Sequence, residues 1–193
     1  MDGALLQRHS IQSSSDQTDY RKTAAIAVNA VSACTPEQCA VWSYPLADGD
    51  EEETIFNMVN SLLLRVHQSG PLWGVDAGRR ALIKEALDYY KRIRKDLSHG
   101  LPFWPLGFAS FESPWTALGL RCPGRAYLAV WRLNGPEERC TFSIPHLRGK
   151  EPNITCAFPA GRACPFAWNA AEGELSVTLD RAWQARLFEL EIH

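Results

Sequence analysis

The stretch LSHGLPFWPLG at residues 97–107 divides the sequence into two halves with different patterns. Before it, apolar residues recur every three or four positions, which is typical of helices that bury one face. After it, apolar and polar residues alternate in short segments separated by turn residues, which is typical of β-strands. The two prolines inside the stretch end any helix that reaches them. We therefore expect two units, at residues 1–102 and 103–193.

Three helices are expected in the first unit. The alanine-rich residues 20–29 follow Asp19, whose carboxylate is a favourable helix cap. Residues 52–66 carry acidic side chains in their first turn and apolar residues at helical spacing, and a Ser-Gly-Pro sequence follows. Residues 76–97 begin with an aspartate and end with a basic turn. Residues 30–45 contain two prolines and no helical period, so they predict irregular chain with one short buried strand.

Six short strands are expected in the second unit, and they predict an antiparallel β-sandwich. They are WTALGLRC, AYLAVWRL, RCTFSI, NITCAF, ELSVTL and RLFELEI. The first unit has helices but little strand on which to pack them. Because an amphipathic helix must bury its apolar face, we interpret the first unit as a piece of a larger α/β structure.

Composition and charge argue against several classes of partner. The formal net charge of -2 gives no electrostatic reason to expect a nucleic acid or an anionic membrane. No apolar run approaches the ~20 residues that span a bilayer. The first residues, MDGALLQRHS, lack the layout of a secretory signal peptide, and the location stays open between the cytoplasm and the exterior. The six cysteines have no zinc-site spacing, so we expect reduced thiols and no metal site.

Several segments resemble, in order and spacing, the C-terminal part of the alpha-galactosidases of glycoside hydrolase family 36. SDQTD at residues 15–19 is similar to the family's S-D-N-T-D segment. PFWPLG at 102–107, with WTALGL and YLAVWR after it, is similar to the entrance of the family's C-terminal β domain. MDGALLQ is similar to the tail of the S-G-G-G-R-x-D element, with Asp2 at its last position. Together these segments extend over nearly the whole chain.

The resemblance implies a fold and a reaction. The fold would be α/β followed by β: the C-terminal fragment of a (β/α)8 TIM barrel at residues 1–102, then an antiparallel β-sandwich at 103–193. A full barrel takes ~250 residues, so most of it would lie outside this chain. The family's reaction is retaining hydrolysis of terminal α-galactosides in oligosaccharides, without a metal or an organic cofactor. Such an oligosaccharide would be the substrate, and a homo-oligomer of the intact enzyme stays open.

The resemblance also assigns roles to three aspartates. Asp16 matches the family's general acid/base, Asp2 matches a position beside the substrate pocket, and Asp19 supports the loop. The family's nucleophile belongs to a K-x-D motif on an earlier strand, which this chain does not contain, so we expect the chain alone to be inactive. An alternative is a noncatalytic carbohydrate-binding or subunit-contact module. Without the resemblance, Asp16 and Asp19 would both be interpreted as helix caps.

Other polar and aromatic residues have structural interpretations. We expect His67 and His99 at helix ends, Trp131 in packing, and the acidic run 48–53 at a solvated helix start. Five aromatic residues around the boundary predict interdomain core rather than a sugar-stacking surface; they are Phe103, Trp104, Phe108, Phe111 and Trp115. The missing barrel strands would leave an open parallel edge and apolar helix faces in water.

Overall fold

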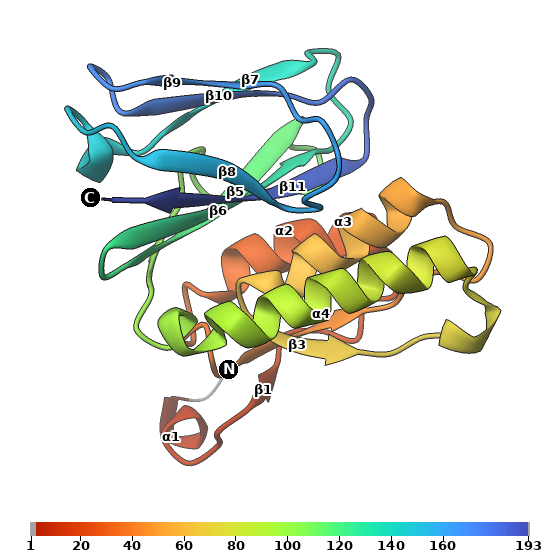
Figure 1. Ribbon diagram of the computed structural model, residues 1–193. Coiled ribbons are helices and arrows are strands. Elements are labelled where there is room, and N and C mark those ends of the chain that lie inside the picture. The colour runs from red at the N-terminus through yellow and green to blue at the C-terminus, as the bar shows by residue number, and fades with distance from the viewer. Residues whose placement is uncertain (1–2, 193) are drawn as a thin grey trace.

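The computed structural model describes residues 3–192 and stacks its elements in layers (Figure 1). A three-stranded parallel sheet lies at one end, helices cover one of its faces, and an antiparallel β-sandwich packs on the far side of the helices. Most strands of the chain are antiparallel. The parallel sheet and the helices come from the first half of the sequence, and the sandwich comes from the second.

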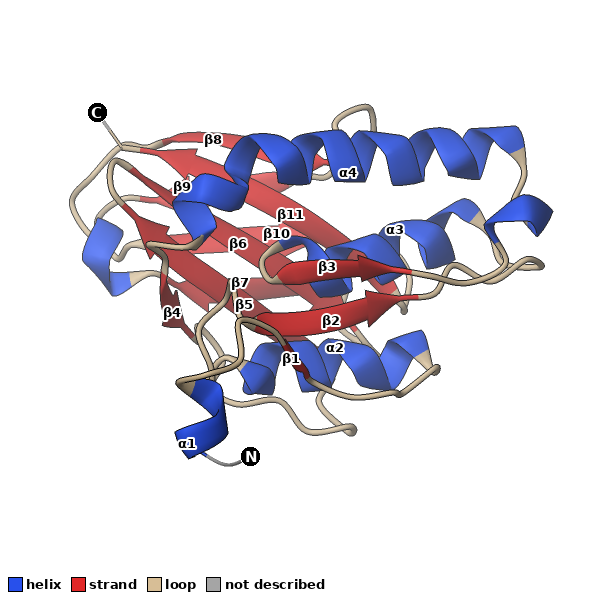
Figure 2. Ribbon diagram, turned by 90° about the horizontal axis from the view of Figure 1, so that it is seen from below, coloured by secondary structure: helices blue, strands red, loops and turns tan. Residues whose placement is uncertain are grey.

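In the first half, strands and helices alternate. The elements are α1 (Gly3–Leu6), β1 (Gln12–Ser13), α2 (Tyr20–Ala30), β2 (Cys39–Ser43), α3 (Glu51–Leu62), β3 (Arg65–Gln68), a 3-10 turn (Leu72–Gly74) and α4 (Ala77–Leu97). The strands run parallel in the order β1-β2-β3. Helices α2, α3 and α4 all lie on the side of the sheet that faces the sandwich. Figure 2 shows the opposite face, which none of the described helices covers.

The predicted helices are confirmed at 20–29 and 76–97, while the one at 52–66 is too long. Asp76 caps α4 by accepting a hydrogen bond from the Arg79 backbone N–H at 3.0 Å. Helix α3 ends at Leu62, and β3 follows it as a strand that the sequence pattern did not indicate. Val66 falls on the apolar stripe of the expected helix, but it pairs with Val41 in the parallel sheet instead. The predicted buried strand within 30–45 is β2.

In the second half, all six predicted strands are confirmed. The elements are β4 (Leu101–Phe103), β5 (Trp115–Cys122), β6 (Arg125–Arg132), β7 (Arg139–Ser143), a 3-10 turn (Pro145–Leu147), β8 (Asn153–Phe158), β9 (Phe166–Asn169), β10 (Glu174–Thr178) and β11 (Gln184–Glu191). One sheet has the order β4-β5-β6-β11-β8 and the other the order β7-β10-β9. The short strands β4 and β9 were not predicted. They are sheet edges, where pairing with a single neighbour is enough.

The helix layer is buried between the two sheet systems. Side chains of α2, α3 and α4 share one apolar core with side chains from β5, β6 and β11. Trp131 of β6 is only 1% exposed and donates its indole N–H to Asn60 Oδ1 of α3 at 2.9 Å, so its expected packing role is confirmed. The expectation of apolar helix faces in water is wrong, because the sandwich covers them. The parallel edge is open, since β1 and β3 each pair only with β2 among the described strands.

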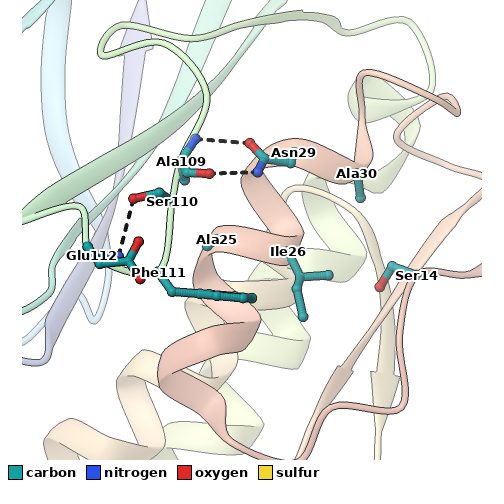
Figure 3. A pocket seen from close by; sticks show the side chains of 9 residues that line it. All are labelled: Ser14, Ala25, Ile26, Asn29, Ala30, Ala109, Ser110, Phe111 and Glu112. Atoms are coloured by element: carbon teal, nitrogen blue, oxygen red, sulfur yellow. Dashed lines mark hydrogen bonds between the residues drawn. The ribbon is translucent and has the colours of Figure 1, made fainter.

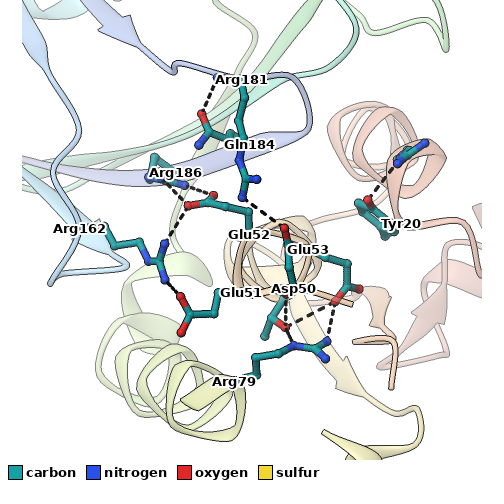
Figure 4. A network of polar contacts seen from close by, with 12 residues as sticks. Tyr20, Asp50, Glu51, Glu52, Glu53, Arg79, Arg162, Arg181, Gln184 and Arg186 are labelled. Carbon is teal, nitrogen blue, oxygen red and sulfur yellow. Dashed lines mark hydrogen bonds and ion pairs between the residues drawn. The ribbon is translucent and has the colours of Figure 1, made fainter. Parts of the chain in front are cut away.

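The acidic run before α3 is not simply solvated, contrary to expectation. Asp50 caps the helix by accepting from the Glu53 backbone N–H at 2.7 Å. Glu52 and Glu53 are buried, and each pairs with an arginine from another element. Figure 4 shows Glu52 meeting Arg186 of β11, and Glu53 meeting Arg79 of α4. The first turn of α3 therefore joins the helix layer to the sandwich through the buried Glu52–Arg186 pair, and α3 to α4 through the buried Glu53–Arg79 pair.

Candidate active site

Asp16 lies in the loop between β1 and α2, where the chain leaves the carboxyl end of the parallel sheet. It is exposed, and within residues 3–192 its carboxylate makes no hydrogen bond or ion pair. Strands β1, β2 and β3 are parallel, so all three end on this same side; the arrowheads of β2 and β3 in Figure 2 point to it. The loops at this end of parallel strands are where α/β folds build their sites.

The loop that carries Asp16 is held by its own neighbours. The Gln17 backbone N–H donates to Ser15 Oγ at 3.1 Å, and the Asp19 backbone N–H donates to Gln17 Oε1 at 3.0 Å. Thr23 Oγ1 donates to the Asp19 carbonyl at 3.1 Å. The polar groups on either side of Asp16 are thus engaged within the loop, while its own carboxylate has no partner in residues 3–192.

Asp19 is the helix cap of α2, as its sequence position predicts. Its backbone is extended, with φ -74° and ψ 103°, and its carboxylate accepts from the Arg21 backbone N–H at 3.0 Å. An aspartate cap satisfies one of the free N–H groups at a helix start and favours the positive end of the helix dipole. The two aspartates of SDQTD thus occupy different settings, one bonded within the loop and one free.

We expect this difference to appear in stability. Asp19→Ala should lower the free energy of unfolding by about 1 kcal/mol, because it removes the cap. Asp16→Ala, as the matched variant three positions earlier, should change it by less than about 0.5 kcal/mol, because no described residue depends on its carboxylate. Urea denaturation of the two variants beside the parent chain measures both values. Equal losses would contradict the division of roles.

The open face of the parallel sheet carries an aromatic cluster that the sequence analysis missed. Along β2, Ser43 points toward the helices, where its Oγ contacts Met58 Sδ at 3.3 Å. Since neighbouring strand residues point to opposite faces, Trp42 points away from the helices. Its indole N–H donates to Ser13 Oγ of β1 at 3.2 Å. Its ring lies 4.9 Å from that of His67 in β3 and stacks on Tyr44, with centroids 5.6 Å apart and planes at 17°.

His67 is a strand residue, so its predicted place at a helix end is wrong. Its partner in the sheet register is Trp42. Its Nδ1 atom is buried without a hydrogen-bond partner among the described residues. Burial lowers the pKa of this imidazole, and the nearby Arg65 charge lowers it further, so the ring is neutral near neutral pH. His99, in contrast, lies at the end of α4 as predicted, with Nδ1 3.1 Å from the Lys95 carbonyl oxygen.

The aromatic residues of the boundary stretch divide into packed and exposed groups. Trp115 is buried in the sandwich core, and Trp104 is half-buried and donates its indole N–H to the Val28 carbonyl at 2.8 Å, as expected for core. Phe103 is also half-buried against the sandwich core. Phe108 and Phe111 are 66% and 59% exposed, so the expectation of core is wrong for them. Phe108 makes an edge-to-face contact with Trp104, with ring centroids 5.2 Å apart, and Phe111 borders a groove beside α2.

Phe111 borders a groove of about 450 Å³ between α2 and residues 109–112. Figure 3 shows its ring reaching toward α2, close to Ile26. The side chain of Asn29 holds the segment to α2, because its Nδ2 donates to the Ala109 carbonyl at 2.8 Å and its Oδ1 accepts from the Ala109 N–H at 3.0 Å. None of Trp42, Tyr44 and His67 lines this groove.

The remaining expectations concern metals, membranes and Asp2. No group of three or more His, Cys, Asp or Glu side chains in residues 3–192 could hold a metal ion, and the six cysteines are free. None of the helices in that range combines the length and the apolar character needed to cross a bilayer. Asp2 lies outside the described residues. Of the three aspartates assigned by resemblance, the structure thus describes Asp16 and Asp19.

Comparisons with known proteins give matches in structure alone. No protein-family model matches the sequence, and no curated protein sequence matches it. The family 36 alpha-galactosidase AgaA from Geobacillus stearothermophilus, solved with raffinose, matches with a TM-score of 0.72 and 11% identity. The match covers 93% of this chain and 25% of AgaA. The alpha-galactosidase from Lactobacillus brevis matches with a TM-score of 0.67 and 13% identity, over 93% of this chain and 26% of its own.

A third match is to an enzyme of a different activity. The noncanonic maltogenic alpha-amylase AmyB from Thermotoga neapolitana matches with a TM-score of 0.55 and 9% identity, over 91% of this chain and 48% of its own. The chain thus spans about a quarter of the alpha-galactosidases that it matches and about half of the amylase. Over nearly its whole length, this chain has the fold of the C-terminal portion of family 36 alpha-galactosidases.

Proposed function

We propose that this chain is the C-terminal part of a retaining alpha-galactosidase, with Asp16 as its general acid/base. The observation that carries the proposal is the place of Asp16, a carboxylate without a partner among residues 3–192 at the carboxyl end of a parallel sheet, in a fold like that of alpha-galactosidases. A retaining glycosidase needs a second carboxyl group about 5–5.5 Å from the acid to attack the sugar. The sequence has no K-x-D motif to supply it, so the chain alone should not turn over substrate.

The first unit is proposed to be the last three βα units of a (β/α)8 barrel. Its strands are parallel and adjacent in chain order, and its helices cover a single face, as in a barrel wall. The division between this unit and the sandwich is proposed near residue 103, within the segment where β4 joins the sandwich sheet. Asp2 remains a candidate for the wall of the substrate pocket.

The substrate is proposed to be a terminal α-galactoside of an oligosaccharide. Related folds support this class, since AgaA structures hold raffinose and stachyose. The match to an enzyme described as a maltogenic amylase means that the fold alone does not select galactose. The choice rests on the SDQTD segment and its resemblance to the alpha-galactosidase motif.

A chimera tests the proposal. This chain would replace the matching C-terminal quarter of AgaA. The rest of AgaA would then supply the remaining barrel strands. We expect hydrolysis of an aryl α-galactoside, and Asp16→Asn in the chimera should lower kcat on raffinose by about 10²–10⁴-fold, because raffinose needs a general acid for its leaving group. The loss should be smaller for a dinitrophenyl α-galactoside, whose leaving group needs no proton.

Azide adds a signature specific to this role. A small anion needs no general base to attack the covalent intermediate, so azide should speed the Asp16→Asn chimera on the dinitrophenyl substrate and yield an azide of retained configuration. The matched control is Asp19→Asn, which keeps the helix cap and should leave the rates within about twofold. A chimera that melts cooperatively and hydrolyses raffinose equally well with Asn at position 16 would refute the assignment.

A further inference from the structure

We infer that Trp42, Tyr44 and His67, here called the aromatic cluster, form the surface on which a pyranose ring of the sugar rests. No sequence motif points to these residues as binding residues. The inference extends the proposed function by naming the residues that would hold the sugar, while binding at the cluster itself does not require catalysis. Its basis is that the indole ring of Trp42 in β2 contacts residues of both neighbouring strands, Ser13 of β1 and His67 of β3.

The aromatic cluster is preorganised. Trp42 is fixed on one side by its hydrogen bond to Ser13 of β1, 3.2 Å long, and on the other by its edge-to-face contact with His67 of β3. Tyr44, directly after β2, stacks on the same indole. Its backbone N–H donates to Asn57 Oδ1 of α3 at 3.1 Å, which fixes the start of the loop. Rings held in this way lose little conformational freedom when a ligand binds.

The chemistry of the aromatic cluster suits a sugar. The C–H faces of a pyranose are apolar and pack on aromatic rings, while its hydroxyls need a few well-placed polar groups. His67 makes no hydrogen bond with any described residue, and its neutral ring offers one donor and one acceptor. The Nδ1 edge of the ring is buried, while Nε2 is not buried and has no partner among the described residues. Nε2 is therefore the ring nitrogen that a sugar hydroxyl can reach.

The place of the aromatic cluster links it to Asp16. Ser13, which holds the Trp42 indole, is the last residue of β1, and Asp16 follows it by three residues in the same chain segment. The cluster points away from the helices and lies near the carboxyl ends of β2 and β3, so in the proposed barrel it would face the mouth where sites of this fold are built. A sugar resting there would lie at the same end of the sheet as the proposed general acid.

Sugar titration of the intact chain tests the inference. Methyl α-galactoside and raffinose would be added while the indole N–H signals of the seven tryptophans are followed by NMR. The Trp42 signal is identified by its loss in Trp42→Phe. We expect a saturable shift of that signal and of the His67 ring signals. Trp42→Ala should weaken binding by about tenfold or more, while Trp42→Phe, which keeps a ring, should retain most of it.

Matched variants separate binding at the aromatic cluster from other effects. Phe111→Ala removes an exposed ring beside the groove at α2 and should leave the affinity unchanged. If Trp42→Ala fails to melt cooperatively, Tyr44→Ala and His67→Gln carry the test, and each should weaken binding by about threefold or more. No saturable shift up to about 100 mM sugar, a range that reaches well beyond weak binding, would overturn the inference. Equal losses in Phe111→Ala would do the same.

The outcomes distinguish this inference from the proposed function. Sugar binding at the aromatic cluster together with an inactive chimera would count against the catalytic role alone. An active chimera whose KM and kcat do not respond to Trp42→Ala would overturn the aromatic cluster alone.

Discussion

Replacing Glu52 by glutamine should lower the free energy of unfolding by about 3–5 kcal/mol, because it leaves the buried guanidinium of Arg186 without its counter-charge. The two side chains are 7% and 5% exposed. They form a two-pronged pair, with Nη1 2.8 Å from Oε2 and Nη2 3.0 Å from Oε1. Arg162 adds a third contact to Glu52, at 3.2 Å, and also pairs with Glu51.

The location of this pair makes its loss consequential. Glu52 is in the first turn of α3 and Arg186 is in β11, so the contact spans the boundary between the helix layer and the sandwich (Figure 4). Burying a charge without a partner is costly in this low-dielectric setting, whereas replacing both partners by apolar residues of similar size is often tolerated. The double variant Glu52→Met with Arg186→Leu should therefore recover most of the stability lost by Glu52→Gln.

A surface ion pair at the same boundary between the helix layer and the sandwich provides the control. Arg181 pairs with Asp50 at 3.3 Å, but the two side chains are 54% and 61% exposed. Arg181→Ala should cost less than about 1 kcal/mol, because water and salt screen exposed pairs. Urea denaturation with a common m-value gives all three differences. If Glu52→Gln lowered the free energy of unfolding no more than Arg181→Ala, the buried pair would not stabilise the contact between the helix layer and the sandwich.

The second large effect is expected at Trp131. Trp131→Ala should lower the free energy of unfolding by about 3–5 kcal/mol, because the substitution leaves a cavity where a wide side chain is fully enclosed. Trp131 is 1% exposed in β6 and belongs to the core that the sandwich shares with the helices. Its loss also leaves Asn60 Oδ1 without the indole N–H that now reaches it at 2.9 Å.

The same substitution at Trp73 is the matched control, since this residue is 89% exposed. Trp73→Ala should change stability by less than about 0.5 kcal/mol. A third variant, Trp131→Phe, keeps a ring but loses the N–H donor, and it should fall between the two. Thermal and urea unfolding of the three proteins tests this order. A small effect at Trp131, similar to that at Trp73, would mean that the core relaxes around the missing ring.

Local signals accounted for the elements that the sequence located well. Helix α4 begins at the cap Asp76 because the cap and the apolar period lie within a few residues of each other. The six longer strands were found because alternation and turn residues are also local. Strand β3 was missed because it forms by pairing with β2. That pairing joins residues far apart in the sequence, so no local pattern of apolar residues reveals it. The edge strands β4 and β9 are too short to show a pattern.

The candidate site divides in the same way. Asp16 was found by its setting in SDQTD, and Asp19 by its place before an alanine-rich run. The aromatic cluster was not found, since it requires the register that aligns Trp42 with His67 and brings β1 beside β2. One signal was available in CAVWS, where the indole stands at a position alternate to the buried Val41 and Ser43. Its meaning depended on knowing which face of the strand is open.

By itself, the sequence determined helices α2 and α4 with their caps, the existence of α3, the six main strands, the change from helices to strands after α4 and the presence of an aspartate in an alpha-galactosidase-like segment. Those features follow from interactions between residues close in the chain. Only the tertiary structure decided that Glu52 meets Arg186, 134 residues away, that the sandwich covers the helices, and that Trp42 and His67 share an open face. Burial and pairing across such separations depend on how whole layers pack, and no local pattern encodes them.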